Sequence, residues 1–245
     1  MEIVFQDEYF VLINKPSNLL VHHSHYARNI EEASLVELLE AEGLKVYPVH
    51  RLDRKTSGLI ICAREKEYVS SFQKLIENNE LEKKYLALLR GFVASEGIID
   101  SPVKNERGNY KEAETHYKCL KQLELPIPVE PYQTSRYSVV EFAPKTGRMH
   151  QLRIHANKIS HPIIGDPKHG NRHHNHMFME KFGIDKLFLH ASSLKFKHPF
   201  TEVELFFEVE VPTCLINSLI LSLIPNFPYK VNLTILHNLH FPKSL

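Results

Sequence analysis

The sequence predicts an α+β fold with a central mixed or antiparallel sheet and flanking helices. Segments with strand and helix patterns follow one another in a mixed, strand-rich order that does not alternate strictly. The 245 residues are enough to bury a substantial core. The 43% of hydrophobic and 24% of charged residues are ordinary for a globular protein. No internal repeat or Gly/Ser-rich linker interrupts this pattern.

The first part of the chain predicts three strand regions and two helices. Leucines recur with helical spacing before Gly43, and apolar residues at steps of three and four mark a second helix around Phe72. TSGLIIC is a continuous apolar run, typical of a strand buried on both faces. The expected elements are two strands in 3–14 with a turn near Asp7, a helix in 31–43, a strand in 56–62, a helix in 65–80 and a strand in 81–93.

The second part predicts further strands, a helix and a closing hairpin. The turn PKTGR precedes a segment with an apolar stripe at helical spacing. The expected elements are a polar loop in 94–112, strands in 113–124 and 137–143, a helix in 149–160 and a hairpin in 187–211. We expect one domain over residues 1–213. An apolar extension of unknown role, nearly free of acids, follows over 214–245.

Charge and cysteine content exclude several classes of protein. The net charge is +1, so a polyanionic partner would have to be bound by a local basic patch. Cys62, Cys119 and Cys214 are odd in number and far apart, which favours reduced thiols in a cytoplasmic protein. The N-terminus does not have the pattern of a signal peptide, and no apolar run is as long as a membrane span.

The segment HRLDRKTSGLIIC, residues 50–62, places Asp53 between Arg51 and Arg54. In an extended segment Arg51 and Asp53 share a face, while Leu52 points into the core. A carboxylate beside guanidinium groups stays ionised, and a positioned, ionised Asp can act as a nucleophile or general base. A purely structural ion pair is the more common role of such neighbours.

A basic strip follows in PKTGRMHQLRIHANKISHPIIGDPKHGN, residues 144–171. Between Lys145 and Arg172 there are six Lys or Arg residues and one acid, Asp166. Positive charge together with the backbone amides of a helix start suits phosphate groups. A solvated basic face is the alternative.

Two further motifs contain residue types that can take part in catalysis or metal binding. In LEKKYLALLRG, Tyr85 offers a stacking face and a hydroxyl that can transfer a proton, although a strand Tyr alone is more often part of the core. The segment HGNRHHNHMF contains four histidines, at positions 169, 173, 174 and 176, but no acid or cysteine, so a solvated loop is favoured over a metal site. Motifs for nucleotide, dinucleotide and zinc-hydrolase sites are absent.

The sequence resembles the RluA-type family of RNA pseudouridine synthases. HRLDRKTSGL, LEKKYLALLRG and GRMHQLRIH match three family motifs in order, and HPIIGDPKHG and LFLHASSLKFKHPFT also fit. The similarity runs from about residue 3 to about residue 211. Within the family, the sequence is most similar to the group that modifies tRNA at position 65. The extra N-terminal RNA-binding domain of many members is not expected here.

The resemblance implies an isomerase with the pseudouridine synthase fold and an active-site cleft. Asp53 would be the essential carboxylate, Arg51 would hold the flipped nucleotide, and Tyr85 would stack on the uracil. Leu152 would line the base pocket and Arg153 would pair with Asp53. The expected contacts to the RNA backbone are Lys145, Arg148, His150 and Lys168.

An isomerisation needs no cofactor and no metal. The expected partner is RNA, tRNA in the first place, with no membrane and no obligate protein partner. Three alternatives stay open: an rRNA uridine synthase of the same family, a non-catalytic RNA-binding module that retains the fold, and a His-dependent metal hydrolase.

Overall fold

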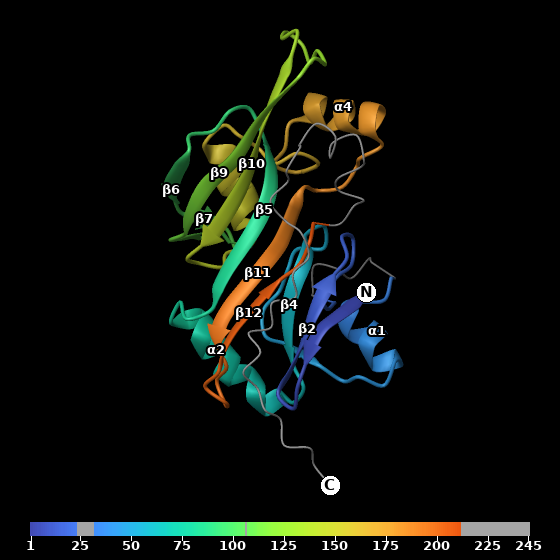
Figure 1. The fold of residues 1–245 in the computed structure, drawn as a ribbon, viewed down its shortest axis with the longest axis vertical. Coiled ribbons are helices and arrows are strands. Elements are labelled where there is room, and N and C mark those ends of the chain that lie inside the picture. The colour runs from blue at the N-terminus through green and yellow to red at the C-terminus, as the bar shows by residue number, and fades with distance from the viewer. Residues whose placement is uncertain (24–31, 106, 212–245) are drawn as a thin grey trace.

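The computed structural model describes residues 1–23, 32–105 and 107–211 (Figure 1). The extension expected over 214–245 lies outside these residues. The strands are β1 (Glu2–Gln6), β2 (Phe10–Lys15), β3 (Tyr47–Pro48), β4 (Ser57–Ala63), β5 (Glu82–Arg90), β6 (Glu96–Asp100), β7 (Val103–Lys104), β8 (Tyr110–Lys111), β9 (Glu114–Leu125), β10 (Ser135–Pro144), β11 (Leu189–Lys197) and β12 (Glu204–Glu208). The helices are α1 (Leu35–Ala41), the short 3₁₀ helix η1 (Lys66–Tyr68), α2 (Val69–Glu77), α3 (Gln151–Lys158) and α4 (Arg172–Phe182).

Ten of these strands form one mixed sheet, which confirms the predicted fold class. The order along its main path is β1-β2-β4-β11-β5-β10-β9-β6, with β12 beside β11 and β3 beside β4. The β4–β11 pair is parallel, and the other pairs are antiparallel. Figure 1 shows that the sheet is long, with the β9–β10 hairpin reaching one end and α1 and α2 near the other.

The continuous apolar run at 56–62 forms a central strand, as predicted. All seven residues of β4 are buried, because alternate side chains of the strand pack into core clusters on its two faces. Gly58 has a φ of +107°, and a Cβ placed there would lie 2.2 Å from the carbonyl oxygen of Ala191. Glycine is therefore required where β4 and β11 approach each other.

The prediction of a polar loop over 94–112 is wrong. This region contains β6, which pairs with β9, and the small β7–β8 ribbon. In β6, Ile99 is buried while Glu96, Ile98 and Asp100 are exposed, and Val103 of β7 is buried. This region has too few apolar residues to reveal an edge strand from the sequence, because every other side chain of such a strand can face the solvent.

The prediction of a solvated loop for the histidine-rich segment is also wrong. Asn171 caps α4 by accepting hydrogen bonds from the backbone N–H groups of His173 and His174. Met177 and Phe178 are buried on the inner face of this helix. The cap and the apolar face stabilise a helix where the histidines alone indicated a loop.

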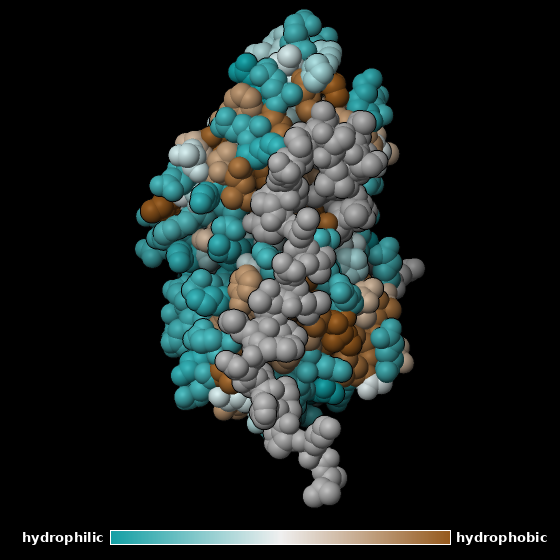
Figure 2. Space-filling model, viewed as in Figure 1, coloured by the Kyte–Doolittle hydropathy of each residue, from teal (hydrophilic) through white to brown (hydrophobic). Residues whose placement is uncertain are grey.

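The core has separate parts that meet near Tyr85. One cluster joins β5, β10, α3 and α4, and another joins β2, β4 and α1; Tyr85 packs against both. Figure 2 shows hydrophilic residues along the β6–β9 side of the visible face and hydrophobic residues near β1 and β2. β1 lies at an edge of the sheet, where Ile3 is partly exposed. Within the described ranges, no helix has the length and apolar character needed to cross a membrane.

Candidate active site

A cavity of about 450 Å³ lies where the parts of the core meet. The segment before β4, helix α2, strand β5 and the start of α3 all contribute to it. Of the nine predicted site residues, it brings seven together: Arg51, Asp53, Tyr85, Arg148, His150, Leu152 and Arg153. Lys145 and Lys168 do not line it and are exposed.

Asp53 is held at the cavity by a turn and a buried neighbour. Its carbonyl oxygen accepts a hydrogen bond of 3.0 Å from the N–H of Thr56, just before β4 begins. Leu52 is buried in the core, while the Asp53 side chain is 22% exposed. Arg51 is exposed and also lines the cavity. Arg51 and Asp53 therefore face the cavity while Leu52 between them faces the core, as inferred from HRLD.

Arg153 links two carboxylates. Its Nη1 donates to Oδ2 of Asp53 over 3.0 Å. Its Nε and Nη2 donate to the two oxygens of Asp166 over 2.6 and 2.8 Å. The Arg153 side chain is 6% exposed and that of Asp166 is 1% exposed. The expected ion pair between Asp53 and Arg153 is thus present, and Asp166 fixes the orientation of Arg153.

Asp166 is the main residue that the sequence reasoning missed. Burial disfavours its charged form, but the hydrogen bonds from Arg153 and from the backbone of His169 and Lys168 lower its pKa. It was counted only as the single acid of the basic strip. Its position before Pro167 in IIGDPKHG is a turn signal, and an Asp in such a turn can accept backbone N–H groups.

Tyr85 extends from β5 into the cavity. Burial, together with the negative charge of Asp53, raises its pKa above the ordinary value. The hydroxyl is therefore protonated at neutral pH and can donate a hydrogen bond. Leu152 and Leu189 line the same cavity and add apolar surface. An aromatic ring between aliphatic walls suits a planar base.

His150 lies beside Asp53 and not on the exposed basic strip. Its Nε2 is 3.8 Å from Oδ2 of Asp53, and its Nδ1 is 3.1 Å from Nε2 of His169. Its φ of 55° places it in the left-handed region at the start of α3. Burial and the nearby Arg153 lower its pKa, although Asp53 opposes this. A neutral imidazole therefore faces the carboxylate at pH 7.

Lys15 stabilises the backbone next to Asp53, a role that the sequence did not indicate. It is completely buried, and its ammonium donates to the carbonyl oxygens of Pro16 and Leu19 at 2.9 Å and of Arg54 at 3.2 Å. Burial lowers its pKa to about 7, while the charge of Asp53 acts in the opposite direction. The only signal was a lysine before Pro16 at the end of an apolar strand.

The histidines that prompted a metal hypothesis have different partners. His174 contacts the hydroxyl of Tyr137 at 2.8 Å, His176 contacts Glu180 at 3.1 Å, and His169 contacts His150. Among the residues that the structure describes, no group of three His, Cys, Asp or Glu side chains is arranged to hold a metal ion. Nothing in this geometry favours the metal hydrolase alternative.

The mixed sheet and the carboxylate in this cavity define a family. The chain belongs to the RNA pseudouridylate synthase family, whose sequence model matches residues 9–158. Two solved human structures have the same fold: RNA Pseudouridylate Synthase Domain Containing 1 and Domain Containing 4. Their TM-scores are 0.66 and 0.63; both are 25% identical to this chain and cover 87% of it, with 85% and 90% of their own chains covered.

Curated relatives are more similar in sequence. The tRNA pseudouridine synthase C of Vibrio cholerae is 41% identical over 213 residues, which cover 82% of this chain and 87% of that protein. The protein of the same name from Haemophilus influenzae is 38% identical over 216 residues, covering 84% and 90%. The predicted family, and with it an isomerase, is confirmed.

Proposed function

We propose that this protein converts one specific uridine of tRNA to pseudouridine, of the position-65 type, with Asp53 as the essential carboxylate. The observation that carries the proposal is the position of Asp53, hydrogen-bonded to Arg153 in a cavity that Tyr85 also lines. The names of the curated relatives support tRNA as the substrate class. Residues 1–213 form the catalytic domain in this proposal.

The reaction moves the glycosidic bond from N1 to C5 of the uracil. The C1′–N1 bond breaks, the base rotates, a C1′–C5 bond forms, the hydrogen leaves C5 and N1 gains a proton. Product and substrate have the same atoms, so the proposal needs no cofactor and no metal. Asp53 attacks the ribose or the base, or removes a proton, and the geometry is compatible with each of these roles.

The surrounding side chains hold the carboxylate and the base. Arg153 holds and orients the Asp53 carboxylate, because Arg153 is itself fixed by Asp166. Tyr85 stacks on the uracil against Leu152, and its protonated hydroxyl is available for proton transfer. A volume of about 450 Å³ lies in the range of small-molecule sites and admits a flipped nucleotide.

Exposed cations bind the RNA backbone in this proposal. Arg148 lines the cavity, Lys145 and Lys168 lie outside it, and all three are exposed and provide positive charge for phosphates. Arg51, at the mouth, occupies the space that the flipped uridine leaves. His150 faces Asp53 in this structure, so its role in the proposal is inside the pocket. We propose an enzyme of the cytoplasm without an obligate protein partner.

The test is to map pseudouridine in RNA treated with the purified protein. Unmodified tRNA transcripts, with only the magnesium that tRNA folding requires, should gain one pseudouridine in the acceptor-side or T-stem region. A 23S rRNA fragment serves as the competing substrate. If the tRNA stays unmodified while the fragment is converted at a discrete uridine, the enzyme is an rRNA synthase. If neither RNA changes but both bind, the protein is a binding module.

A further inference from the structure

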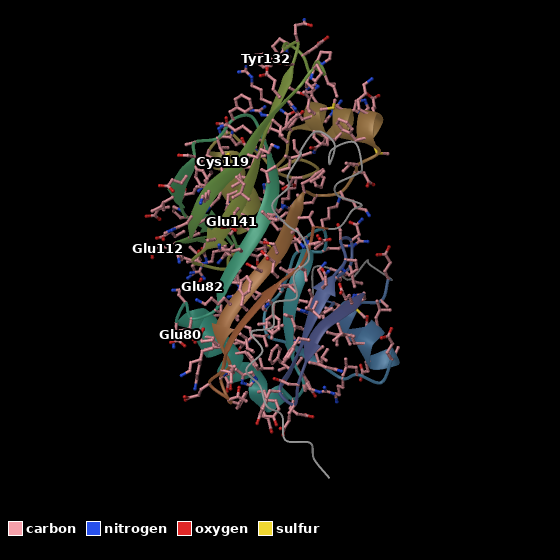
Figure 3. All side chains as sticks on the ribbon, viewed as in Figure 1. Glu80, Glu82, Glu112, Cys119, Tyr132 and Glu141 are labelled. Carbon is pink, nitrogen blue, oxygen red and sulfur yellow. The ribbon has the colours of Figure 1, made fainter. Side chains whose placement is uncertain are left out.

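Lys83 lies in the cavity without a partner. It is two residues before Tyr85 on β5, and residues two apart on a strand point to the same face. Both line the cavity. In the described part of the chain, the ammonium of Lys83 makes no hydrogen bond and no ion pair. Its neighbour Lys84 points to the other face of the sheet, where its ammonium is 3.0 Å from Oε1 of Glu141, a residue labelled in Figure 3.

The ammonium of Lys83 reaches the opposite wall of the cavity. A Cβ placed on Gly147 would be 4.0 Å from Lys83 Nζ. The backbone N–H of Gly147 also has no hydrogen-bond partner among the described residues. The side chain of Lys83 on β5 and the loop before α3 therefore border the same space.

The charges around Lys83 do not neutralise it. Glu77 lines the cavity but forms no ion pair with it, and Asp53 is already paired with Arg153. His50 is half-buried beside it, and removal from solvent together with the charge of Lys83 lowers the pKa of His50 to about 3. A neutral imidazole cannot compensate a cation. A partly buried cation without a counter-ion is costly unless an anion binds to it.

We propose that Lys83 and the backbone N–H of Gly147 bind one backbone phosphate of the RNA beside the flipped nucleotide. The proposal rests on the proposed function only in requiring an RNA ligand. Flipping a nucleotide out of a stem brings its flanking phosphates to the mouth of the pocket. An ammonium and an amide N–H are both phosphate donors. The binding site is thus distinct from the exposed lysines on the outer strip.

The test compares Lys83→Met with Lys84→Met, a matched control one residue away on the opposite face. Dissociation constants for unmodified tRNA transcripts are measured as a function of KCl concentration. Lys83→Met should weaken binding at least about tenfold at low salt and reduce the slope of log K against log[KCl] by about 0.7 to 0.9. Lys84→Met should match the wild type in affinity and slope, and Lys83→Arg should keep most of the affinity.

Two results would overturn the proposal: equal affinities and slopes for Lys83→Met and the wild type, or a loss of turnover without a loss of affinity. If Lys83→Met is poorly folded, Lys83→Gln is used, together with transcripts that carry single neutral methylphosphonates. One such position should then weaken wild-type binding. A wild-type protein that binds tRNA but converts no uridine would contradict the proposed function, while the salt comparison would still decide the role of Lys83.

Discussion

Asp166 accepts two hydrogen bonds from Arg153, of 2.6 and 2.8 Å, whereas Asp53 accepts one of 3.0 Å from the same guanidinium. The bidentate pair is almost completely buried and fixes the plane of the guanidinium. The third nitrogen therefore points at Asp53 before any RNA binds. The orientation of Asp53, the proposed catalytic carboxylate, therefore depends on Asp166, which does not line the cavity.

Replacing Asp53 with Asn should abolish isomerisation and largely spare RNA binding. The change keeps the size of the side chain and removes the charge that the proposed reaction requires. Product formation and the dissociation constant for tRNA are measured with the same protein preparation. A variant that still formed pseudouridine at close to the wild-type rate would show that Asp53 is not the essential carboxylate.

Replacing Asp166 with Asn should lower kcat at least about tenfold and leave the affinity for RNA nearly unchanged, because Arg153 loses its fixed orientation. Breaking one partner of a buried ion pair also costs about 3 to 5 kcal/mol of stability. Kinetics are therefore measured at a temperature where the variant is folded. The double variant Asp166→Asn/Arg153→Ala should be no slower than Arg153→Ala alone. Additive losses would contradict a positioning role.

Replacing Lys145 with Ala should weaken RNA binding, reduce its salt dependence and leave turnover at saturating RNA nearly normal. Lys145 is exposed and does not line the cavity, so only its charge toward phosphates is removed. Arg153→Ala should instead lower turnover and leave the affinity for RNA nearly normal. Lys118→Ala is the control, because Lys118 lies beside Glu141 and away from the cavity. Equal effects on kcat and KM in both Lys145→Ala and Arg153→Ala would contradict this division.

The protein should lose stability as the pH falls from about 6.5 to 4. Burial lowers the pKa of His190 and His174 to about 4, and that of His50 to about 3. The unfolded chain therefore binds more protons in this window, so each histidine decreases the free energy of unfolding by at most about 1.4 kcal/mol per pH unit. Urea unfolding from pH 7.5 to 5 measures this slope.

Single variants test the source of the acid lability. His190→Gln should flatten the dependence on pH. His176→Gln should not, because His176 is 70% exposed and pairs only with Glu180. A slope that is the same in both variants and the wild type would assign the acid lability to other groups.

Gly58→Ala should destabilise the protein by at least about 3 kcal/mol, because the new Cβ would overlap the carbonyl oxygen of Ala191. Gly43→Ala is the matched control. Gly43 also has a positive φ, of +83°, but no atom lies within 4 Å of its Cβ position. It should cost only about 1 to 2 kcal/mol from backbone strain. Thermal or urea unfolding of the two variants separates the steric effect from the strain, and equal losses would contradict the close approach of β4 and β11.

Local patterns predicted the elements whose hydrophobic spacing is regular. The run at 56–62 became β4, the helical spacing around Phe72 became α2, and the Tyr85 segment became β5. In these cases one stretch of sequence contains both the pattern and its cause. The ion pair of Asp53 with Arg153, two residues that lie 100 positions apart, was expected only from the resemblance to the family.

Other features depend on residues far apart in the chain. The closing hairpin was predicted, but nothing in residues 187–211 shows that β11 lies between β4 and β5. The partner of Asp166 could not be read from a strip that contains six cations. Lys83 and Lys84 are adjacent residues of the same type, so the sequence gives no reason to assign them different roles. The ion pair of Lys84 with Glu141 on the neighbouring strand distinguishes them.

The central position of β11 has a consequence for synthesis on the ribosome. The edges of β4 and β5 that β11 later joins are completed roughly a hundred residues before β11 emerges. At typical elongation rates these edges stay unpaired for about 5 to 20 s, a period in which exposed strands can pair with other chains. Asp53 and Tyr85 lie on opposite sides of that gap. A nascent chain therefore carries both halves of the cavity but gains their final arrangement only when β11 inserts, late in translation.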